Sequence, residues 1–493
     1  MHFTRTLFLR LPPHFGYVRA HPHDLTLPFA SAYVSSMVKT TGRAVEVLDV
    51  WANGWSMEKV LNRASEFRPD VVFFDSSAGA VPITLQVGRE IKKLLPVKSI
   101  IFGTVPTYFP EVLFREPSLF DVGMAGECEE TSVELLDAWE EGKSMREVAG
   151  LVYWDAEKSR PVKTEERPLT MDLDQLPHID YSLFNLKYYR KFSFPVPLFR
   201  PVRWGHVLAT RGCPYRCSFC GYDHRQSLGK AFRKFSPERV ADEFQILARE
   251  HGVNAVSIED DCFTLDRAHV FALCDEIESR NVGVKWVAQT RVDLLDRALM
   301  KRMKRAGCVG LSLGVESGSD RILDLLRKGT TRAKSEKAIH EAEEEGLMLR
   351  LLFMIGNPTE TEEEVEETLD LALKAKAITI QVHFCTPYPG TSFFGQGKAD
   401  MEDWEDYSSY NAIHRNLSKV PDQRLRELRN RIYHKYYFSW RYFKLFCRQR
   451  LLYLAGQAAS DVPLILRAFW YMVRRPSASK KRSFSETAKK QFY

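Results

Sequence analysis

The chain has 493 residues, with 70 Lys and Arg against 64 Asp and Glu, for a formal net charge of +6. Hydrophobic residues make up 44% and charged residues 27%, ordinary values that exclude collagen-like, disulfide-stabilised miniature and wholly disordered chains. No run of about 18 apolar residues occurs, so no transmembrane helix is expected. The first residues do not resemble a secretory signal, because Arg10, Pro12 and Pro13 interrupt their apolar run.

Positive charge is concentrated at the C-terminal end. Residues 420–493 hold 17 Lys and Arg against 4 Asp and Glu, whereas the rest of the chain holds 53 against 60. The body is therefore slightly acidic, which argues against a nucleic-acid-binding protein. The nine cysteines are an odd number, and three of them lie within eight residues. This usage predicts a reducing, cytoplasmic location and ligand chemistry instead of disulfide bonds.

Residues 1–145 predict a Rossmann-like α/β domain. Short apolar runs alternate with helical patterns such as residues 56–67, and this alternation favours a parallel sheet with helices on both faces. The predicted strands are residues 6–10, 45–50, 71–75, 99–103 and 119–124.

Small residues follow three of these strands, at the sheet edge where ligands bind in such folds. Ser76 and Ser77 follow the third strand, Gly103 ends the fourth, and Gly126 and Glu127 come after the fifth. Small side chains let a large flat ligand approach the backbone. The alternative is that these residues form ordinary tight turns.

Residues 146–200 predict a hairpin and then an extended linker, because the segment is rich in Pro and charged residues. The linker leads to a second series of strands and helices over residues 201–400. A helical C-terminal region is expected over residues 401–493.

Residues 206–224 are the most informative segment. An apolar strand leads into Cys213, Cys217 and Cys220, and three thiolates this close on one loop can hold a metal site. Three ligands to a four-iron cluster leave one iron open for a non-protein ligand. His224 offers a zinc alternative, because three Cys and one His can close a tetrahedral structural site. The loop follows the first strand of a βα series, where barrel active sites lie, and this position favours the cluster.

This segment resembles the radical S-adenosylmethionine (SAM) superfamily, whose motif is C-x3-C-x-aromatic-C, with Phe219 in the aromatic place. Five further strand–helix units follow it, so the resemblance implies a partial (β/α)6 barrel over residues 201–400. Their strands are expected within residues 255–266, 284–295, 308–331, 349–365 and 378–394.

The resemblance implies a 4Fe–4S cluster on the three cysteines and SAM on its open iron. One electron from the cluster then gives methionine and a 5′-deoxyadenosyl radical, which abstracts hydrogen from an unactivated carbon. Phe219 is expected near the adenine, and Glu259 and Asp260 near the methionine ammonium. Arg291 is expected to pair with the SAM carboxylate and Glu316 with the ribose. The alternative for each polar residue is an ion pair or cap at a strand end.

A Rossmann-like domain ahead of such a barrel resembles the cobalamin-binding subgroup of the superfamily. The resemblance implies cobalamin at the sheet edge formed by Ser76, Ser77, Gly103, Gly126 and Glu127. Two departures stand beside it. The cobalt-ligating D-x-H-x-x-G signature is absent, as it is in many members of this subgroup, and the expected Gly-Gly-x-His is replaced by a tetrapeptide that begins at Gly103.

The other cysteines are scattered. Cys262 and most of the rest lie in apolar or helical contexts and are expected to be small buried side chains. Cys385, at the end of the sixth predicted barrel strand, could face the cavity, but core packing is favoured.

The C-terminal region combines aromatic and basic residues. Residues 433–446 hold eight aromatic side chains with Lys and Arg interleaved, and residues 462–475 are apolar with a basic end. A basic helix with an aromatic face fits the membrane interface, so residues 433–475 predict contact with a membrane surface. Packing against the barrel and nucleic-acid binding are the alternatives.

These expectations together favour a cobalamin-dependent radical SAM enzyme that methylates a carbon atom of a small molecule or lipid. A one-electron donor such as flavodoxin or ferredoxin is implied. The alternative within enzymes is a non-methylating cyclase or ring-rearranging enzyme acting on a lipid, porphyrin or secondary metabolite. The alternative of another class is a zinc-stabilised binding protein.

Overall fold

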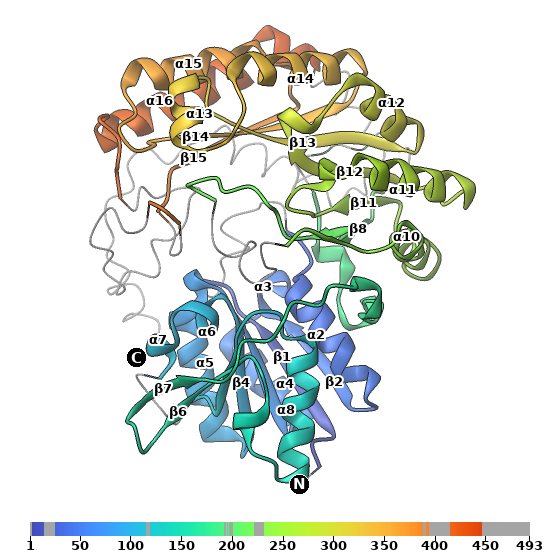
Figure 1. Ribbon diagram of the computed structural model, residues 1–493, viewed down its shortest axis with the longest axis vertical. Coiled ribbons are helices and arrows are strands. Elements are labelled where there is room, and N and C mark those ends of the chain that lie inside the picture. The colour runs from blue at the N-terminus through green and yellow to red at the C-terminus, as the bar shows by residue number, and fades with distance from the viewer. Residues whose placement is uncertain are drawn as a thin grey trace.

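The computed structural model places two large sheets along the long axis of the molecule, with the N-terminal sheet at the bottom of the view (Figure 1). The residues that it describes are 2–13, 25–114, 119–191, 194, 196, 201–220, 231–387, 391–393 and 415–445. Both sheets were expected from the alternation of strands and helices, so the α/β fold class is confirmed.

The first sheet has the strand order β2-β1-β3-β4-β5-β6-β7, and its first five strands are parallel. These five are β1 (Arg5–Arg10), β2 (Ala44–Asp49), β3 (Val71–Ser76), β4 (Lys98–Gly103) and β5 (Val122–Met124). The helices around it are α2 (Phe29–Thr40), α3 (Val50–Asn53), α4 (Met57–Phe67), α5 (Val81–Leu94), α6 (Thr104–Tyr108), α7 (Pro110–Leu113) and α8 (Glu129–Glu141).

Alternate strand residues of this sheet face two separate cores. Leu7 and Phe74 pack with α4 and α5 on one face, and Phe8 and Phe73 pack with α2 and α8 on the other. Because both faces are covered, the strands read as continuous apolar runs in the sequence.

The expected hairpin consists of β6 (Leu151–Asp155) and β7 (Arg160–Lys163). It does not stand apart in the linker, because β6 pairs antiparallel with β5 and extends the first sheet. Short 3-10 turns at Leu173–Gln175, Tyr181–Leu183 and Leu186–Tyr188 then lead toward the second sheet.

The second sheet is wholly parallel, with the order β15-β14-β13-β12-β11-β8. Its strands are β8 (Trp204–Val207), β11 (Ala255–Ile258), β12 (Lys285–Arg291), β13 (Cys308–Glu316), β14 (Met348–Ile355) and β15 (Thr379–Phe384). Its helices are α10 (Pro237–His251), α11 (Arg267–Ser279), α12 (Arg297–Arg305), α13 (Asp320–Leu325), α14 (Arg332–Glu344) and α15 (Glu362–Lys374).

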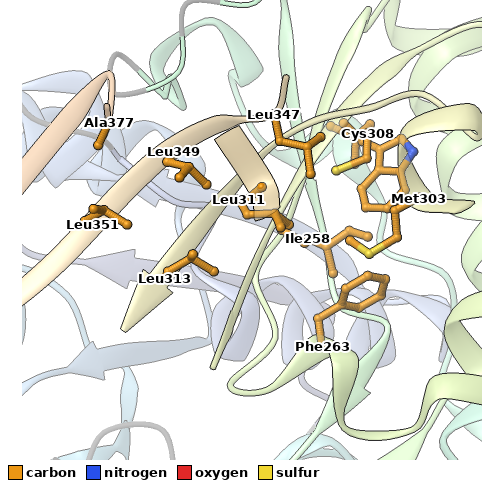
Figure 2. Close-up of a cluster of buried hydrophobic side chains, with 14 of the residues drawn as sticks. Ile258, Phe263, Met303, Cys308, Leu311, Leu313, Leu347, Leu349, Leu351 and Ala377 are labelled. Atoms are coloured by element: carbon orange, nitrogen blue, oxygen red, sulfur yellow. The ribbon is translucent and has the colours of Figure 1, made fainter. Parts of the chain in front are cut away.

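One face of this sheet packs against the helices, and Figure 2 shows Ile258, Leu311, Leu313, Leu349 and Leu351 in that core. Successive strand residues point to opposite faces. The residues that alternate with these leucines therefore belong to the other face of the sheet, which is the inner face of a partial barrel.

Helix α16 (Asp422–Tyr437) covers the edge of β15. The hydroxyl of Tyr437 accepts from the Ile380 N–H and donates to the Ile380 carbonyl, both at 3.0 Å, and Tyr433 does the same at Val382 over 2.9 and 3.4 Å. An open sheet edge is prone to pair with other chains, so these tyrosines protect it.

The packing alternative for the aromatic segment is therefore correct for part of it. Tyr436, Tyr437 and Tyr442 are buried, whereas Phe438, Trp440 and Phe443 are 62, 68 and 52% exposed. Residues 446–475 lie outside the described residues. In the part of the chain that the structure describes, no helix is both long and apolar enough to cross a membrane.

Candidate active site at the carboxyl ends of the two sheets

The cysteine loop begins where strand β8 ends. Two-residue strands β9 (Thr210–Arg211) and β10 (Arg233–Lys234) pair antiparallel on either side of it. Cys217 is buried, and Cys213 and Cys220 are partly exposed. A four-iron cluster gives each thiolate its own iron, so its ligands need not converge on one point.

A single-ion site would need such convergence. Among the described side chains, no group of three or more His, Cys, Asp or Glu could hold one metal ion. His224, the fourth ligand of the zinc alternative, lies outside the described residues.

Asp260 holds the start of the cysteine loop. Its carboxylate accepts from the Ala209 N–H at 2.8 Å and from the Thr210 hydroxyl at 2.9 Å. Asp260 is 1% exposed, and burial raises its pKa to about 7. The structure thus gives Asp260 backbone and hydroxyl partners where the sequence suggested the SAM ammonium group.

Glu259 also has partners other than the expected ammonium. Its Oε1 lies 2.7 Å from Lys191 Nζ, in the linker, and 3.0 Å from His206 Nδ1 on β8. Although burial raises the pKa of Glu259, Lys191 and His206 hold it well below its ordinary value. Glu259 therefore carries a charge that is already balanced by the linker.

Arg291, at the end of β12, lies against Cys217 of the cysteine loop. Its Nη1 is 3.5 Å from the Cys217 sulfur, and its Nε and Nη2 donate to Asp293 over 3.0 and 2.9 Å. Nη2 also donates to the Lys328 carbonyl, and the guanidinium carbon is 3.7 Å from the Tyr215 ring centroid. With these contacts made, the expected pairing with the SAM carboxylate would require Arg291 to rearrange.

Glu316, Lys328 and Phe219 come together as a second group. Lys328 Nζ lies 2.9 Å from Glu316 Oε1 and 5.7 Å from the Phe219 ring centroid. Burial lowers the pKa of Lys328, but Glu316 and Cys217 keep it above its ordinary value. Glu316 has φ +68°, a conformation that a non-glycine residue rarely adopts and that occurs at ligand sites.

Sequence reasoning missed two residues of this site. Lys328 follows α13 in an Arg-Lys-Gly segment. The position of this segment after the fourth barrel strand could have identified Lys328 as a candidate site residue. Cys262, expected to be a core residue, is indeed buried, but its thiol forms a hydrogen bond, and not a disulfide, with the Cys213 side chain. That hydrogen bond, together with burial, raises the pKa of the Cys262 thiol.

Small residues follow the carboxyl ends of strands in the first sheet. Ser76 at the end of β3 is buried, and its hydroxyl has no hydrogen-bond partner. Gly103 at the end of β4 has φ +99°, and a Cβ there would lie 2.9 Å from the Ser76 carbonyl. Gly126 has φ +77° with nothing within 4 Å of where its Cβ would be. An unsatisfied hydroxyl beside open backbone fits a large planar ligand such as cobalamin; Ser77 is partly exposed next to them.

Glu127 differs from the other residues proposed for that edge. Both of its carboxylate oxygens accept hydrogen bonds from arginines of the second domain, Arg211 and Arg233. The carboxylate therefore joins the two domains, and these arginines are its partners at the position where the sequence suggested cobalamin.

The comparisons with known proteins agree with both halves of this site. The sequence profile of the B12 binding domain matches residues 17–136, and that of the Radical SAM superfamily matches residues 207–372. An uncharacterized methyltransferase of Pyrococcus horikoshii is 30% identical over 87% of this chain and 92% of its own length.

Two further relatives carry more specific names. The anaerobic magnesium-protoporphyrin IX monomethyl ester cyclase of Cereibacter sphaeroides is 28% identical over 78% of this chain, which spans 62% of the cyclase. The hopanoid C-3 methylase of Methylococcus capsulatus is 25% identical over 74% of this chain and 67% of the methylase.

Solved structures share the fold. The radical SAM methyltransferase TsrM from Kitasatospora setae, with cobalamin and a [4Fe–4S] cluster bound, superposes with a TM-score of 0.63 at 22% identity, over 80% of this chain and 74% of TsrM. The cobalamin-dependent SAM radical enzyme OxsB superposes with the same TM-score at 18% identity, over 80% of this chain and 54% of OxsB. The chain belongs to the radical SAM superfamily, as a member with an N-terminal cobalamin-binding domain that uses a 4Fe–4S cluster, SAM and cobalamin.

Proposed function

We propose that this enzyme transfers a methyl group to an unactivated carbon of its substrate. The observation that carries the proposal is the direct connection between the two cofactor edges: Glu127, next to Gly126, binds Arg211, two residues before Cys213. When bound, the cluster supplies the electron that cleaves SAM, and cobalamin supplies a methyl group. A domain arrangement that brings both edges to one place suits a reaction that needs both.

The residues of the chain then have defined tasks. Cys213, Cys217 and Cys220 hold the cluster, and Ser76 and Gly103, with Ser77 and Gly126 beside them, border the corrin. Glu316 and Phe219 bind the ribose and adenine of SAM. Lys328, buried against Glu316, fixes that carboxylate in place.

A reconstitution experiment tests methyl transfer. The protein is purified anaerobically, loaded with iron, sulfide and hydroxocobalamin, and supplied with SAM and a one-electron reductant such as reduced flavodoxin or ferredoxin. We expect about one corrinoid per chain and both 5′-deoxyadenosine and S-adenosylhomocysteine as SAM products. Deoxyadenosine without S-adenosylhomocysteine would contradict methyl transfer.

Radical cyclisation is the second candidate, because 78% of this chain aligns with the Cereibacter cyclase. A cyclase forms a ring without adding a methyl group. The product mass separates the two reactions: methylation adds about 14 Da to the substrate. We favour methylation because the Pyrococcus horikoshii relative, which this chain covers over 92% of its length, is named a methyltransferase.

We also propose that the enzyme works in the cytoplasm with its C-terminal region, residues 433–475, at an anionic membrane surface. Phe438, Trp440 and Phe443 are exposed beyond the tyrosines that hold α16 in place, and Lys444 Nζ lies 5.6 Å from the Trp440 ring centroid. Exposed aromatic side chains next to basic ones suit a headgroup region. A lipid substrate would be consistent with this position.

Vesicle sedimentation tests the membrane contact. The full chain should sediment with anionic vesicles at low salt and less with neutral ones, because each basic residue near the surface contributes about 1 kcal/mol. Trp440→Ser with Phe443→Ser should abolish sedimentation. Met171→Ser is the control, since Met171 is 67% exposed at a site outside the C-terminal region.

Truncation after Ser418 is a poorer test of the membrane contact, because it also removes α16 and uncovers the edge of β15. Equal sedimentation of all variants would refute the contact.

A further inference from the structure

Four charged side chains form a buried cluster between the two domains, here called the Arg–Glu cluster. Glu127 comes from the segment between β5 and α8, Glu129 is the first residue of α8, and Arg211 and Arg233 come from the ladder β9–β10. Their side chains are between 1 and 6% exposed. The feature was not expected from the sequence, where Glu127 was assigned to cobalamin.

The contacts within the cluster are specific. Arg233 holds Glu127 with a two-pronged fork, Nη1 to Oε2 at 2.7 Å and Nη2 to Oε1 at 2.9 Å. Arg211 divides its fork between Glu127 at 3.1 Å and Glu129 at 2.7 Å. The linker joins the cluster at Thr170, whose N–H donates to Glu127 and whose carbonyl accepts from Arg233.

Two positive and two negative groups balance in the cluster, so its burial leaves no net charge. Aromatic side chains close it from water: the Arg211 guanidinium lies 4.6 Å from the Tyr33 ring centroid, and Tyr33 stacks on Phe235 at 5.9 Å. Buried charge pairs contribute little net stability but define geometry, since a displaced partner leaves an uncompensated buried charge. Such a cluster is therefore suited to holding the two domains in one fixed relative position.

The positions of the cluster residues show what is being fixed. Glu127 directly follows Gly126 at the edge where the corrin is proposed to lie, and Arg211 stands two residues before Cys213. We infer that the Arg–Glu cluster sets the distance and orientation of the corrin edge relative to the iron–sulfur loop. Its members are positioning residues. This inference rests on the proposed function, because it assumes that the two cofactors act on each other.

A second arginine cluster provides a matched control. Arg43 lies between Asp137 and Glu140 at 2.7 and 3.0 Å, with 9% of its side chain exposed. All three residues belong to the first domain. Arg43→Gln therefore removes an arginine with similar partners without affecting the domain junction.

The experiment compares Arg233→Gln, Glu127→Gln and Arg43→Gln as full chains loaded with cluster and cobalamin. Iron and corrinoid per chain are measured first, and pulsed EPR then gives the distance distribution between Co(II) of the corrinoid and the reduced cluster. We expect a single narrow distance distribution for the native chain and for Arg43→Gln. For Arg233→Gln and Glu127→Gln we expect a broad distribution. Displacement of about 1 Å can cost roughly 100-fold in rate. S-adenosylhomocysteine formation should therefore fall by about that factor, while deoxyadenosine formation persists.

The outcomes separate the inference from the proposed function. A native chain that binds no corrinoid overturns both. The inference alone is overturned if the native chain binds corrinoid but Arg233→Gln and Glu127→Gln keep the native distance distribution. Equal broadening in Arg43→Gln would also overturn it, because the effect would then be general destabilisation. If Arg233→Gln does not fold, Arg233→Lys keeps the charge and loses the fork, and the same comparison applies.

Discussion

The guanidinium of Arg291 lies with Nη1 3.5 Å from the sulfur of Cys217, and its other nitrogens are bound to Asp293 and to the Lys328 carbonyl. A positively charged donor directed at a thiolate that holds the cluster stabilises the reduced cluster more than the oxidised one, because the reduced cluster carries more negative charge. Arg291 is therefore placed to influence the reduction potential of a cluster held by Cys217.

Replacement of Arg291 by Gln should lower the reduction potential of the cluster, because the reduced state loses a hydrogen bond and a nearby positive charge. A difference of about 1 kcal/mol between the two oxidation states corresponds to roughly 40 mV for one electron. The potential is measured by EPR-monitored titration without SAM. If Arg291 acts only on the SAM carboxylate, this potential stays unchanged and only SAM affinity falls.

Each of the changes Cys213→Ala, Cys217→Ala and Cys220→Ala should remove the cluster, since each thiolate holds one iron. Iron counting and a deoxyadenosine assay on the reconstituted variants give the result. Cys308→Ala is the matched control, because Cys308 is buried on β13 within the helix-side core. A loop variant that keeps both iron and SAM cleavage would contradict the assignment of that cysteine.

Glu316→Gln should weaken SAM binding while the iron content stays constant. The change removes a charged hydrogen-bond acceptor and leaves buried Lys328 without its carboxylate partner. Loss of such an interaction costs on the order of 1.5–3 kcal/mol, or about 10- to 150-fold in affinity. Anaerobic calorimetry measures the affinity directly. An unchanged dissociation constant would exclude Glu316 from the SAM site.

The sequence predicted the elements of the fold better than the partners of the polar residues. The central strands β3 and β4 leave continuous apolar runs, because both of their faces are buried, and both lie within one residue of the predicted ranges. The hairpin β6–β7 was expected, but its attachment to β5 was not, since a run of strand residues does not reveal which edge it joins.

The same limit explains the site residues. Glu127, Glu259 and Asp260 were correctly expected at or just after strand ends, where ligands bind, but their partners come from segments between 43 and 106 residues away. Lys191 and Arg233 have no local pattern that links them to these carboxylates. Phe219 and Glu316 were named from the resemblance to the superfamily and their SAM roles stay predictions; in the structure both lie against Lys328.

Gly318→Ala should disturb the Glu316 loop without direct contact with SAM. A Cβ on Gly318 would lie 2.3 Å from the Glu367 carbonyl oxygen and 2.8 Å from the Thr368 Cα, both backbone atoms of α15. The loop or the helix must move, at a cost of about 1–3 kcal/mol. Thermal melting should show the loss, and SAM affinity should fall with it. Ser317→Ala removes the side-chain hydrogen bonds to Thr368 and to the Ser319 N–H but introduces no clash, so it should have a smaller effect on both.

Glu364→Gln should destabilise the protein in a pH-dependent way. Glu364 accepts two hydrogen bonds from Arg321, each 2.6 Å long, and these bonds hold its pKa at about 2. The folded pKa is below the unfolded value of about 4.3. The stabilisation is therefore complete above that value and is lost as the pH falls through about 2.

Because Arg321 is half-exposed, we expect a modest contribution of about 1–2 kcal/mol at pH 7. The melting temperature of Glu364→Gln should lie below that of the native chain at pH 7 and pH 5, and the difference should shrink at pH 3. Lys93→Gln is the control, since its pair with Glu90 is a surface contact within one helix. A difference that stays the same from pH 7 to pH 3 would show that Glu364 acts through the shape of its side chain and not through its charge.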